Sequence, residues 1–189
     1  TASSATTSGG AYSGTSIAYT VNGSGLNGPV TDANYGAITH SFGVYPATAG
    51  HRWVDTNNTS ATHITFGFAA PKNIDQLLIW TYTQAGGLND RGIRNFDVQV
   101  DTGSGFTTVA SASINAAPND QSQHTPQVVA IGAHVGVEQL RLLNVTNQGS
   151  TSAIGLDEVW FRDSSYRFGE PSPGFVGVLG NETSTDRAV

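Results

Sequence analysis

Short apolar runs that alternate with polar residues constrain this chain more than any other feature. In the run 62–68, Ile64, Phe66 and Phe68 fall on one face, and polar or small residues fall on the other. A period of two indicates a strand with one buried face. No segment of useful length has the 3.6-residue period of a helix, and Gly or Pro stands at every junction. The sequence therefore predicts an all-β fold.

Other runs predict the remaining strands. The run 74–82 is apolar on both faces, which favours a central strand. The segment 101–105 (Asp-Thr-Gly-Ser-Gly) has the composition of a hairpin turn between two strands. The full set of predicted strands is 16–21, 62–68, 74–82, 96–100, 106–114, 127–131, 137–145 and 157–162. So many short strands predict a β-sandwich with jelly-roll topology.

The chain of 189 residues is long enough for one domain with its own core. Residues 1–14 are rich in Thr, Ser, Ala and Gly, so we expect a flexible N-terminal segment or a loosely held first strand. We expect the sandwich to span 15–163, with a long irregular excursion at 26–50. Residues 164–189 are polar and rich in Pro and Gly, which predicts a C-terminal tail or linker.

Composition and charge argue against several classes of function. Charged residues make up 12% of the chain, against roughly 25% in typical soluble domains. The net charge is −6 and Lys72 is the only lysine, so we expect no nucleic-acid partner and no anionic membrane surface. No apolar run approaches the roughly 20 residues of a membrane span, so we expect no membrane insertion.

The sequence contains no cysteine and no methionine, and both absences bear on where the protein is located. No disulfide or thiol chemistry is possible without cysteine. A chain without an initiator Met is expected to be processed or excised, and one rich in Thr, Ser and Gly resembles bacterial exported proteins in composition. We therefore expect a secreted or cell-surface location, as part of a larger multidomain protein.

One strand–loop–strand stretch, residues 79–98, carries the side chains that best predict chemistry. Its loop holds an aromatic ring, amides, a carboxylate and an arginine. A sugar offers hydroxyls to planar donors and acceptors, and one apolar face to an aromatic ring. An arginine can hold two hydroxyls or a carboxylate in a bidentate grip. With a net charge of −6, an acidic polysaccharide would need a local arginine pair.

The predicted carbohydrate-binding residues come from this loop and from two others. They are His51, Arg52, Tyr82, Gln84, Asn89, Asp90, Arg91, Asn147 and Gln148. Each also has a structural interpretation that the sequence leaves open. Tyr82 could cover core at a strand end, Arg91 could hold Asp90 or a loop carbonyl, and Asn89 could be a turn former.

Catalytic readings find less support in the sequence. Glycoside hydrolysis needs two carboxylates that flank the scissile bond, and no such pair is recognisable. The chain has no Gly-x-Ser-x-Gly nucleophile elbow with partners and no phosphate-cradling loop. The five histidines show no close pair at zinc-ligand spacing. We therefore expect no catalytic residues.

Several short motifs, taken in order, resemble a known family. They are Val-Asn-Gly-Ser-Gly-Leu at 21–26, Arg-Trp-Val-Asp at 52–55, Ile-Thr-Phe at 64–66, Ile-Trp-Thr-Tyr at 79–82, Arg-Gly-Ile at 91–93 and Ile-Gly-Leu-Asp-Glu-Val-Trp-Phe at 154–161. The set resembles discoidin-like (coagulation factor V/VIII C-type) domains, in the branch of bacterial galactose-binding-like carbohydrate-binding modules. The resemblance implies a galactose-binding-domain-like jelly roll whose loops converge at one end to bind a polysaccharide or glycan.

The same resemblance implies a structural calcium ion. Its ligands would come from Asn22 and Ser24 in the first motif and from Glu158 in the last. Calcium takes six to eight oxygen ligands, mostly carbonyls with one or two carboxylates. Asn22 is an amide where the family usually has a carboxylate. Glu158 could instead be solvated, or cap the turn without metal.

The resemblance and the loop chemistry favour a non-catalytic carbohydrate-binding module of a secreted bacterial protein. One alternative is a structural or protein-adhesion domain of a cell-surface assembly. Thr81 and Thr83 motivate it, because they stand beside Tyr82 where the family usually has asparagines. A second alternative is a jelly-roll lyase or hydrolase.

Overall fold

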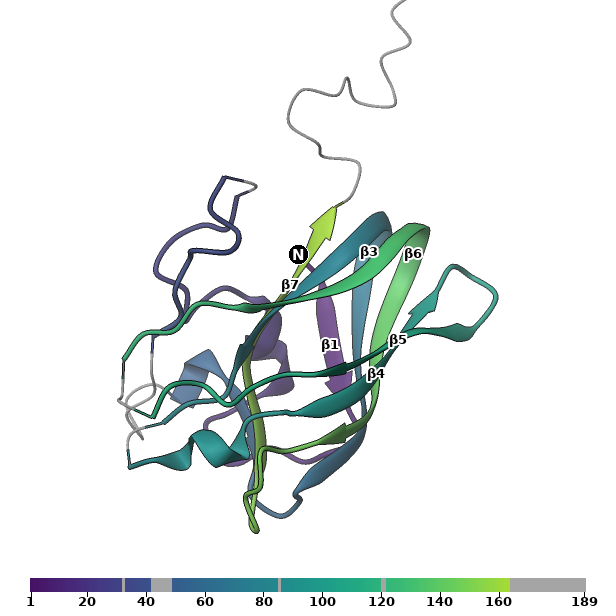
Figure 1. The fold of residues 1–189 in the computed structure, drawn as a ribbon. Helices are drawn as coiled ribbons and strands as arrows, with labels where there is room; N and C mark the ends of the chain where they lie inside the picture. Colours follow the sequence, from purple (N-terminus) through teal and green to yellow (C-terminus); the bar gives the residue numbers. More distant parts are fainter. Residues whose placement is uncertain (32, 42–48, 85, 120–121, 164–189) are drawn as a thin grey trace, which may run out of the picture.

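A computed structural model describes residues 1–31, 33–41, 49–84, 86–119 and 122–163 (Figure 1). Every described strand pairing is antiparallel, and three short 3-10 helices lie in the connections. The strands are β1 (Ser4–Thr7), β2 (Trp53–Asp55), β3 (Ser60–Thr81), β4 (Asn95–Asp101), β5 (Phe106–Ser113), β6 (Gln127–Thr146) and β7 (Ile154–Asp163). The helices are η1 (Ile17–Val21), η2 (Ala49–His51) and η3 (Leu88–Arg91). The predicted all-β fold is confirmed.

Two long strands, β3 and β6, pair with each other and belong to both layers of the sandwich. The strand order is β2-β7-β3-β6-β4-β5, and β1 pairs with β3. The first half of β3 carries β1 and the second half carries β7, while β4 pairs with the second half of β6. The register between β3 and β6 shifts repeatedly between Gly67 and Gln76. Such bulges bend strands, so one continuous pairing can serve two layers.

The core lies between the two layers. Ile64 and Phe66 in the first half of β3 are fully buried, as are Leu77 and Ile79 in the second half. The rings of Phe66 and Phe161 meet edge to face across the layers, with centroids 5.2 Å apart. This contact joins the first half of β3 to β7, and the predicted β-sandwich is confirmed.

The second half of β3 is buried on both faces, as its continuous apolar run predicts. Leu78 and Trp80 point away from the main core, yet each is at most 1% exposed. The Trp80 indole Nε1 donates to the carbonyl oxygen of Ile38 at 3.1 Å. The described part of the 26–50 excursion therefore covers this face of the sheet.

The hairpin predicted at 101–105 is confirmed. β4 and β5 pair on either side of it. The carboxylate of Asp101 accepts from the backbone N–H of Gly103 at 2.8 Å and of Gly105 at 2.9 Å. Both glycines have positive φ, 97° and 102°, which only glycine adopts without strain.

The structure corrects several predicted boundaries. The strand expected at 16–21 is the helix η1, which Ser16 caps by accepting from Ala18 N at 3.3 Å. The flexible segment expected at 1–14 contains β1, which pairs with β3 in register Ser4 to Gly67. Two pairs of separately predicted strands each form one long strand in the structure. The runs 62–68 and 74–82 together form β3, and the runs 127–131 and 137–145 together form β6. The tail expected at 164–189 lies outside the described residues.

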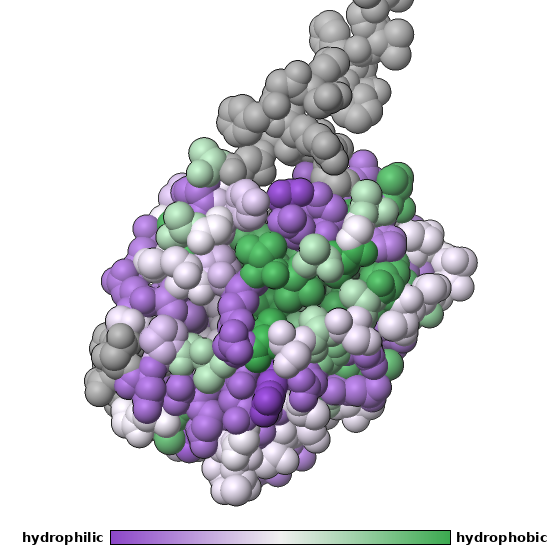
Figure 2. Space-filling model, viewed as in Figure 1, coloured by the Kyte–Doolittle hydropathy of each residue, from purple (hydrophilic) through white to green (hydrophobic). Residues whose placement is uncertain are grey.

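No helix in the described ranges is both long enough and apolar enough to cross a membrane. The space-filling view shows apolar residues gathered over β3, β6 and β7, with hydrophilic surface around them (Figure 2). Trp53 and Trp80 are fully buried, whereas Trp160 is partly exposed.

Replacing Phe66 by alanine should lower the free energy of unfolding by about 3–5 kcal/mol, because it removes the ring that packs between the layers. Urea unfolding followed by tryptophan fluorescence measures the change. Val135→Ala is the matched control, since Val135 is 73% exposed and its loss should cost less than about 0.5 kcal/mol. Equal effects of the two substitutions would contradict the described packing.

Candidate functional site

Three loops converge at one end of the sandwich, where β3 ends and β4 begins. Gly92, after η3, forms a parallel bridge to Gly155, and Ile93 forms an antiparallel bridge to Asn147. The backbone N–H of Ser150 donates to the carbonyl oxygen of Asp90 at 3.2 Å. We call this end the loop end. It lies around η3 at the lower left of Figure 1, where Figure 2 shows largely hydrophilic surface.

Tyr82 lies beneath the loop end and not on its surface. The residue is 1% exposed and packs with Val54, Ala153 and Leu88 in a small cluster apart from the main core. Gly155 makes room for the ring, because a Cβ at that position would lie 2.6 Å from Tyr82 Cδ2. This burial corrects the prediction that the Tyr82 ring is open to a sugar. The ring covers core at a strand end instead.

The Tyr82 side chain nevertheless organises the groups around it. Its hydroxyl donates to the side-chain oxygen of Gln84. Burial raises the pKa of the Tyr82 hydroxyl, and the nearby Arg52 and Arg91 guanidinium groups oppose that rise. The two predicted arginines therefore flank one phenol from different segments of the chain.

Arg52 is almost fully buried and only partly paired. Its Cζ lies 5.4 Å from the centroid of the Tyr82 ring, within the range of a cation–π contact. Its Nη1 donates to the carbonyl oxygen of Thr83 at 2.5 Å and lies 3.8 Å from Asp157 Oδ1. Arg52 Nε and Nη2, like Arg91 Nε, have no hydrogen-bond partner in the described structure. Unpartnered buried groups of this kind are rare and call for an explanation.

A buried histidine pair borders Arg52 and was not among the predicted site residues. The rings of His40 and His124 are 6.0 Å apart, and their backbones form a bridge. Burial lowers the pKa of His40 to about 3 and that of His124 to about 4. Both rings are therefore neutral at neutral pH. Gly25 is required beside them, because a Cβ there would lie 2.0 Å from His40 Nε2.

Asp157 is the buried carboxylate of this cluster. It is fully buried, and its Oδ2 accepts from the backbone N–H of Thr83 at 3.3 Å and lies 3.6 Å from His40 Nδ1. Burial raises its pKa to about 7, while Arg52 and the Thr83 N–H pull the pKa down. A residue this deep positions Arg52 and does not reach a ligand itself.

Three of the four predicted amides hold the loops together. Asn89 Nδ2 donates to the carbonyl oxygen of Ala117 at 2.8 Å. Asn147 Nδ2 donates to the carbonyl oxygens of Ser150 and Ala153, both at 2.8 Å. Gln148 Nε2 donates to the carbonyl oxygens of Ile93 at 2.9 Å and Ile114 at 2.8 Å. Their donor groups are therefore occupied by backbone carbonyls. The predicted residues that keep a side-chain polar atom without a protein partner among the described residues are His51, Arg52, Gln84, Asp90 and Arg91, and Arg52 is itself almost fully buried. Of these, His51 Nδ1 and Asp90 Oδ1 are buried without a partner among the described residues.

The residues predicted to bind calcium also meet, although 135 positions separate Gly23 from Glu158. Both carboxylate oxygens of the fully buried Glu158 accept from the backbone N–H of Gly23 at 3.2 Å. In the same turn, Asn22 Oδ1 accepts from Ser24 N at 2.9 Å, and Ser24 Oγ donates to Gly50 O at 3.2 Å. Burial raises the pKa of Glu158 to about 8.

This arrangement suits a hard cation only if backbone oxygens take part. Within the described ranges, no group of three or more His, Cys, Asp or Glu side chains could hold a metal ion. Calcium, however, accepts mainly carbonyl oxygens with one or two carboxylates. A buried carboxylate that faces a glycine-rich turn, with no cationic side chain bonded to it, fits that requirement.

Comparisons with known proteins give matches at the level of structure. No protein-family model matches the chain, and no curated protein matches it. The structure described as the CBM32 of AlyQ in complex with 4,5-unsaturated mannuronic acid matches with a TM-score of 0.53 at 15% identity, over 86% of this chain and 95% of that one.

Two further structures match over similar lengths. GH31 CBM32-2 bound to GalNAc has a TM-score of 0.54 at 12% identity, over 85% of this chain and 96% of that one. The lectin domain of lectinolysin complexed with Lewis B antigen has a TM-score of 0.54 at 15% identity, over 85% and 92%. The fold that the motif resemblance implies is therefore confirmed.

Replacing Glu158 by glutamine should flatten part of the pH dependence of stability, measured with a calcium chelator present. Because the folded-state pKa of Glu158 is raised to about 8, its proton stabilises the fold at low pH, and this stabilisation is lost as pH rises. Relative to Glu158→Gln, the wild-type free energy of unfolding should fall by about 2 kcal/mol between about pH 6 and pH 8. Parallel curves for the two proteins would contradict the buried, protonated Glu158.

Proposed function

We propose that this domain is a non-catalytic carbohydrate-binding module that holds a polysaccharide or glycan at its loop end. The observation that carries the proposal is the convergence of Arg52 and Arg91 on Tyr82, with guanidinium nitrogens left unpartnered, on a fold shared with sugar-bound domains. The domain would serve a secreted or cell-surface protein with further domains.

Four side chains at the loop end have distinct chemical roles in this proposal. Arg91, half-buried on η3, donates N–H groups to sugar hydroxyls or to a carboxylate. Gln84 and Asp90 add an amide and a carboxylate that accept from hydroxyls. Tyr82 supports Arg52 from below through its ring, so rigidity comes from the scaffold and the ligand need not order the arginine.

The two buried carboxylates support a binding role over a catalytic one. Asp157 and Glu158 are both fully buried, and each accepts from a backbone N–H. A glycosidase needs two carboxylates that reach the scissile bond from opposite sides. Groups so placed stabilise the scaffold and do not touch a substrate.

We also infer that calcium binds between the turn 22–25 and Glu158 as a structural ion. A cation there would favour the ionised carboxylate that burial otherwise disfavours. Backbone oxygens of the turn, with the side chains of Asn22 and Ser24, are the further ligands in this proposal. The ion would then hold the end of η1 against β7.

A protein-adhesion role is the second candidate, and two observations favour it. The Tyr82 ring is buried, and the amides of Asn89, Asn147 and Gln148 are occupied by backbone carbonyls. Apolar side chains are also exposed along β6, with Val135 at 73% and Val128 at 46%. Concentration-dependent self-association in analytical ultracentrifugation, without retention on any glycan, would favour this role over sugar binding.

Arg91→Ala should weaken glycan binding at least tenfold, because a lost charged hydrogen bond costs about 1.5–3 kcal/mol. Affinity electrophoresis in gels that contain neutral or uronate-rich polysaccharides measures the effect. Arg94→Ala is the matched control, since Arg94 is exposed three residues further along the same segment. Unchanged binding by Arg91→Ala, or absence of binding by the wild type to every polysaccharide, would contradict the proposed site.

Calcium should raise the melting temperature of the wild type at pH 7. An ion at 100 times its Kd stabilises the fold by about 2.7 kcal/mol. Glu158→Gln keeps the shape and the acceptor for Gly23 N but lacks the charge, so its melting temperature should not respond to calcium. Magnesium serves as the ionic-strength control, and equal shifts with either ion in both proteins would rule out a specific calcium site.

A further inference from the structure

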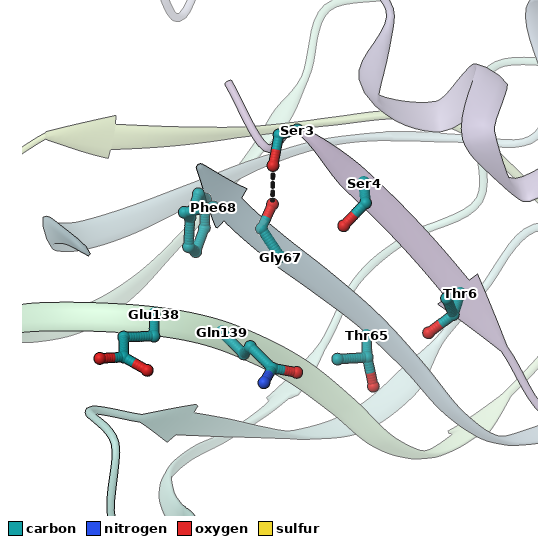
Figure 3. A pocket seen from close by; sticks show the side chains of 8 residues that line it. All are labelled: Ser3, Ser4, Thr6, Thr65, Gly67, Phe68, Glu138 and Gln139. Carbon is teal, nitrogen blue, oxygen red and sulfur yellow. Dashed lines mark hydrogen bonds between the residues drawn. The ribbon is translucent and has the colours of Figure 1, made fainter. Parts of the chain in front are cut away.

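A hollow lies away from the loop end, on the outer face of the layer that contains β1 and the first half of β3. Its volume is about 360 Å³, within the range typical of small-ligand sites. Three strands line it: β1, β3 and β6 (Figure 3). The lining residues are Ser3, Ser4, Thr6, Thr65, Gly67, Phe68, Glu138 and Gln139.

The alternation of β3 creates this hollow. Ile64 and Phe66 point into the core, so Thr65 and Gly67 point outward. Gly67 has no side chain to fill the space, and a Cβ there would lie 2.7 Å from Ser4 Oγ. The short strand β1 then forms one wall and β6 forms the other, as Figure 3 shows.

Four polar side chains of the hollow are free to bind a ligand, whereas Ser3 Oγ donates to Gly67 O and Thr65 Oγ1 accepts from Arg141. The side chains of Ser4, Thr6, Glu138 and Gln139 are exposed and have no hydrogen bond or ion pair within the described structure. In contrast, a second hollow between β4 and β5 has its polar groups bonded to each other. There Asp97 accepts from Ser111 Oγ at 2.6 Å and from Asn144 Nδ2 at 3.2 Å.

The hollow also has a rigid apolar surface. Phe68 is partly exposed at one end, and its ring packs edge to face on Phe161 with centroids 5.1 Å apart. Beside the hollow, Arg141 Nε donates to Thr65 Oγ1 at 3.1 Å, and its guanidinium stacks 3.7 Å from the Phe106 ring centroid. These contacts fix the floor of the hollow, so a ligand would meet an ordered surface.

We propose that this hollow is a second carbohydrate-binding site, for a neutral glycan. Hydroxyls, an amide and a carboxylate that are not bonded to one another suit the vicinal hydroxyls of a sugar, and the Phe68 ring suits its C–H face. Glu138 is the only charged residue in the lining, and the net charge of the chain is −6. The Glu138 carboxylate therefore disfavours an acidic saccharide here, and the nearby Arg141 guanidinium is already engaged by Thr65 and the Phe106 ring.

The second site is independent of the loop-end proposal and lies apart from it. Glu138 Oε1 is 3.4 Å from the position of a Cβ at Gly103, in the hairpin at the far end of β4. The loop end is at the start of β4, so the length of that strand, roughly 20 Å at 3.4 Å per residue, separates the two. A test can therefore reject one of the two proposed sites and leave the other standing.

Titrations of the ¹⁵N-labelled full chain, followed by amide chemical shifts, test the proposal. The probes are neutral gluco-, manno- and galacto-oligosaccharides and, separately, uronate oligosaccharides. At least one neutral probe should shift amides of β1 and β6, and uronates should not. Glu138→Ala/Gln139→Ala should weaken that response at least tenfold, while Arg91→Ala should leave it unchanged.

Gln99→Ala is the control for the loss of an amide, because Gln99 lies outside the hollow and bonds Thr108 at 3.1 Å. It should bind as the wild type does. Gly67→Ala fills the floor of the hollow without removing a polar group, and it should also weaken binding. The absence of shifts in β1 and β6 with every neutral probe, or an unchanged response in the double variant, would overturn the second site. Shifts confined to residues 51–52 and 84–91 would support the loop end and reject the hollow.

Discussion

The continuous pairing of β3 with β6 is the constraint on which the rest of this structure depends. Because both strands pass through the bulges near Gly67 and Gln76, their two halves build two layers that face each other. The Phe66–Phe161 contact then closes the space between them. The ends of the strands are fixed as a result, and so are the loops that leave them. A rigid sandwich can in this way hold polar loop residues that have little packing of their own.

The loop end retains polar groups at an energetic cost. Arg52, Asp157 and His40 are taken out of water, and only part of their hydrogen-bonding capacity is met by Thr83 and Ser41. Burial of unpaired polar atoms costs roughly 1–3 kcal/mol each. Scaffolds that serve only stability have little reason to keep such groups, whereas binding sites require preorganised donors. The retention of these buried, partly unpaired groups supports the proposed binding role of the loop end above them.

The two proposed sites on this domain differ in the charged side chains that they present. The first is organised around two arginines, and the second around a single carboxylate, Glu138. If both proposed sites bind, two sites on one rigid body would raise the effective concentration of a polymer that can reach both. A mixed polysaccharide with neutral and acidic blocks would match that pair of surfaces.

Elements with local signals could be predicted from the sequence. Alternation identified the long strands and most of the core, but not β1 or β2, and the Asp101 hairpin followed from its turn residues. Contacts between distant segments, in contrast, could be seen only in the folded chain. Tyr82 is buried because Gly155, 73 positions away, leaves space for its ring, and His40 meets His124 only through the fold. The alternation of a strand shows which side chains share one face of it. Whether that face is buried depends on segments that are distant in the sequence and pack against it only in the folded protein.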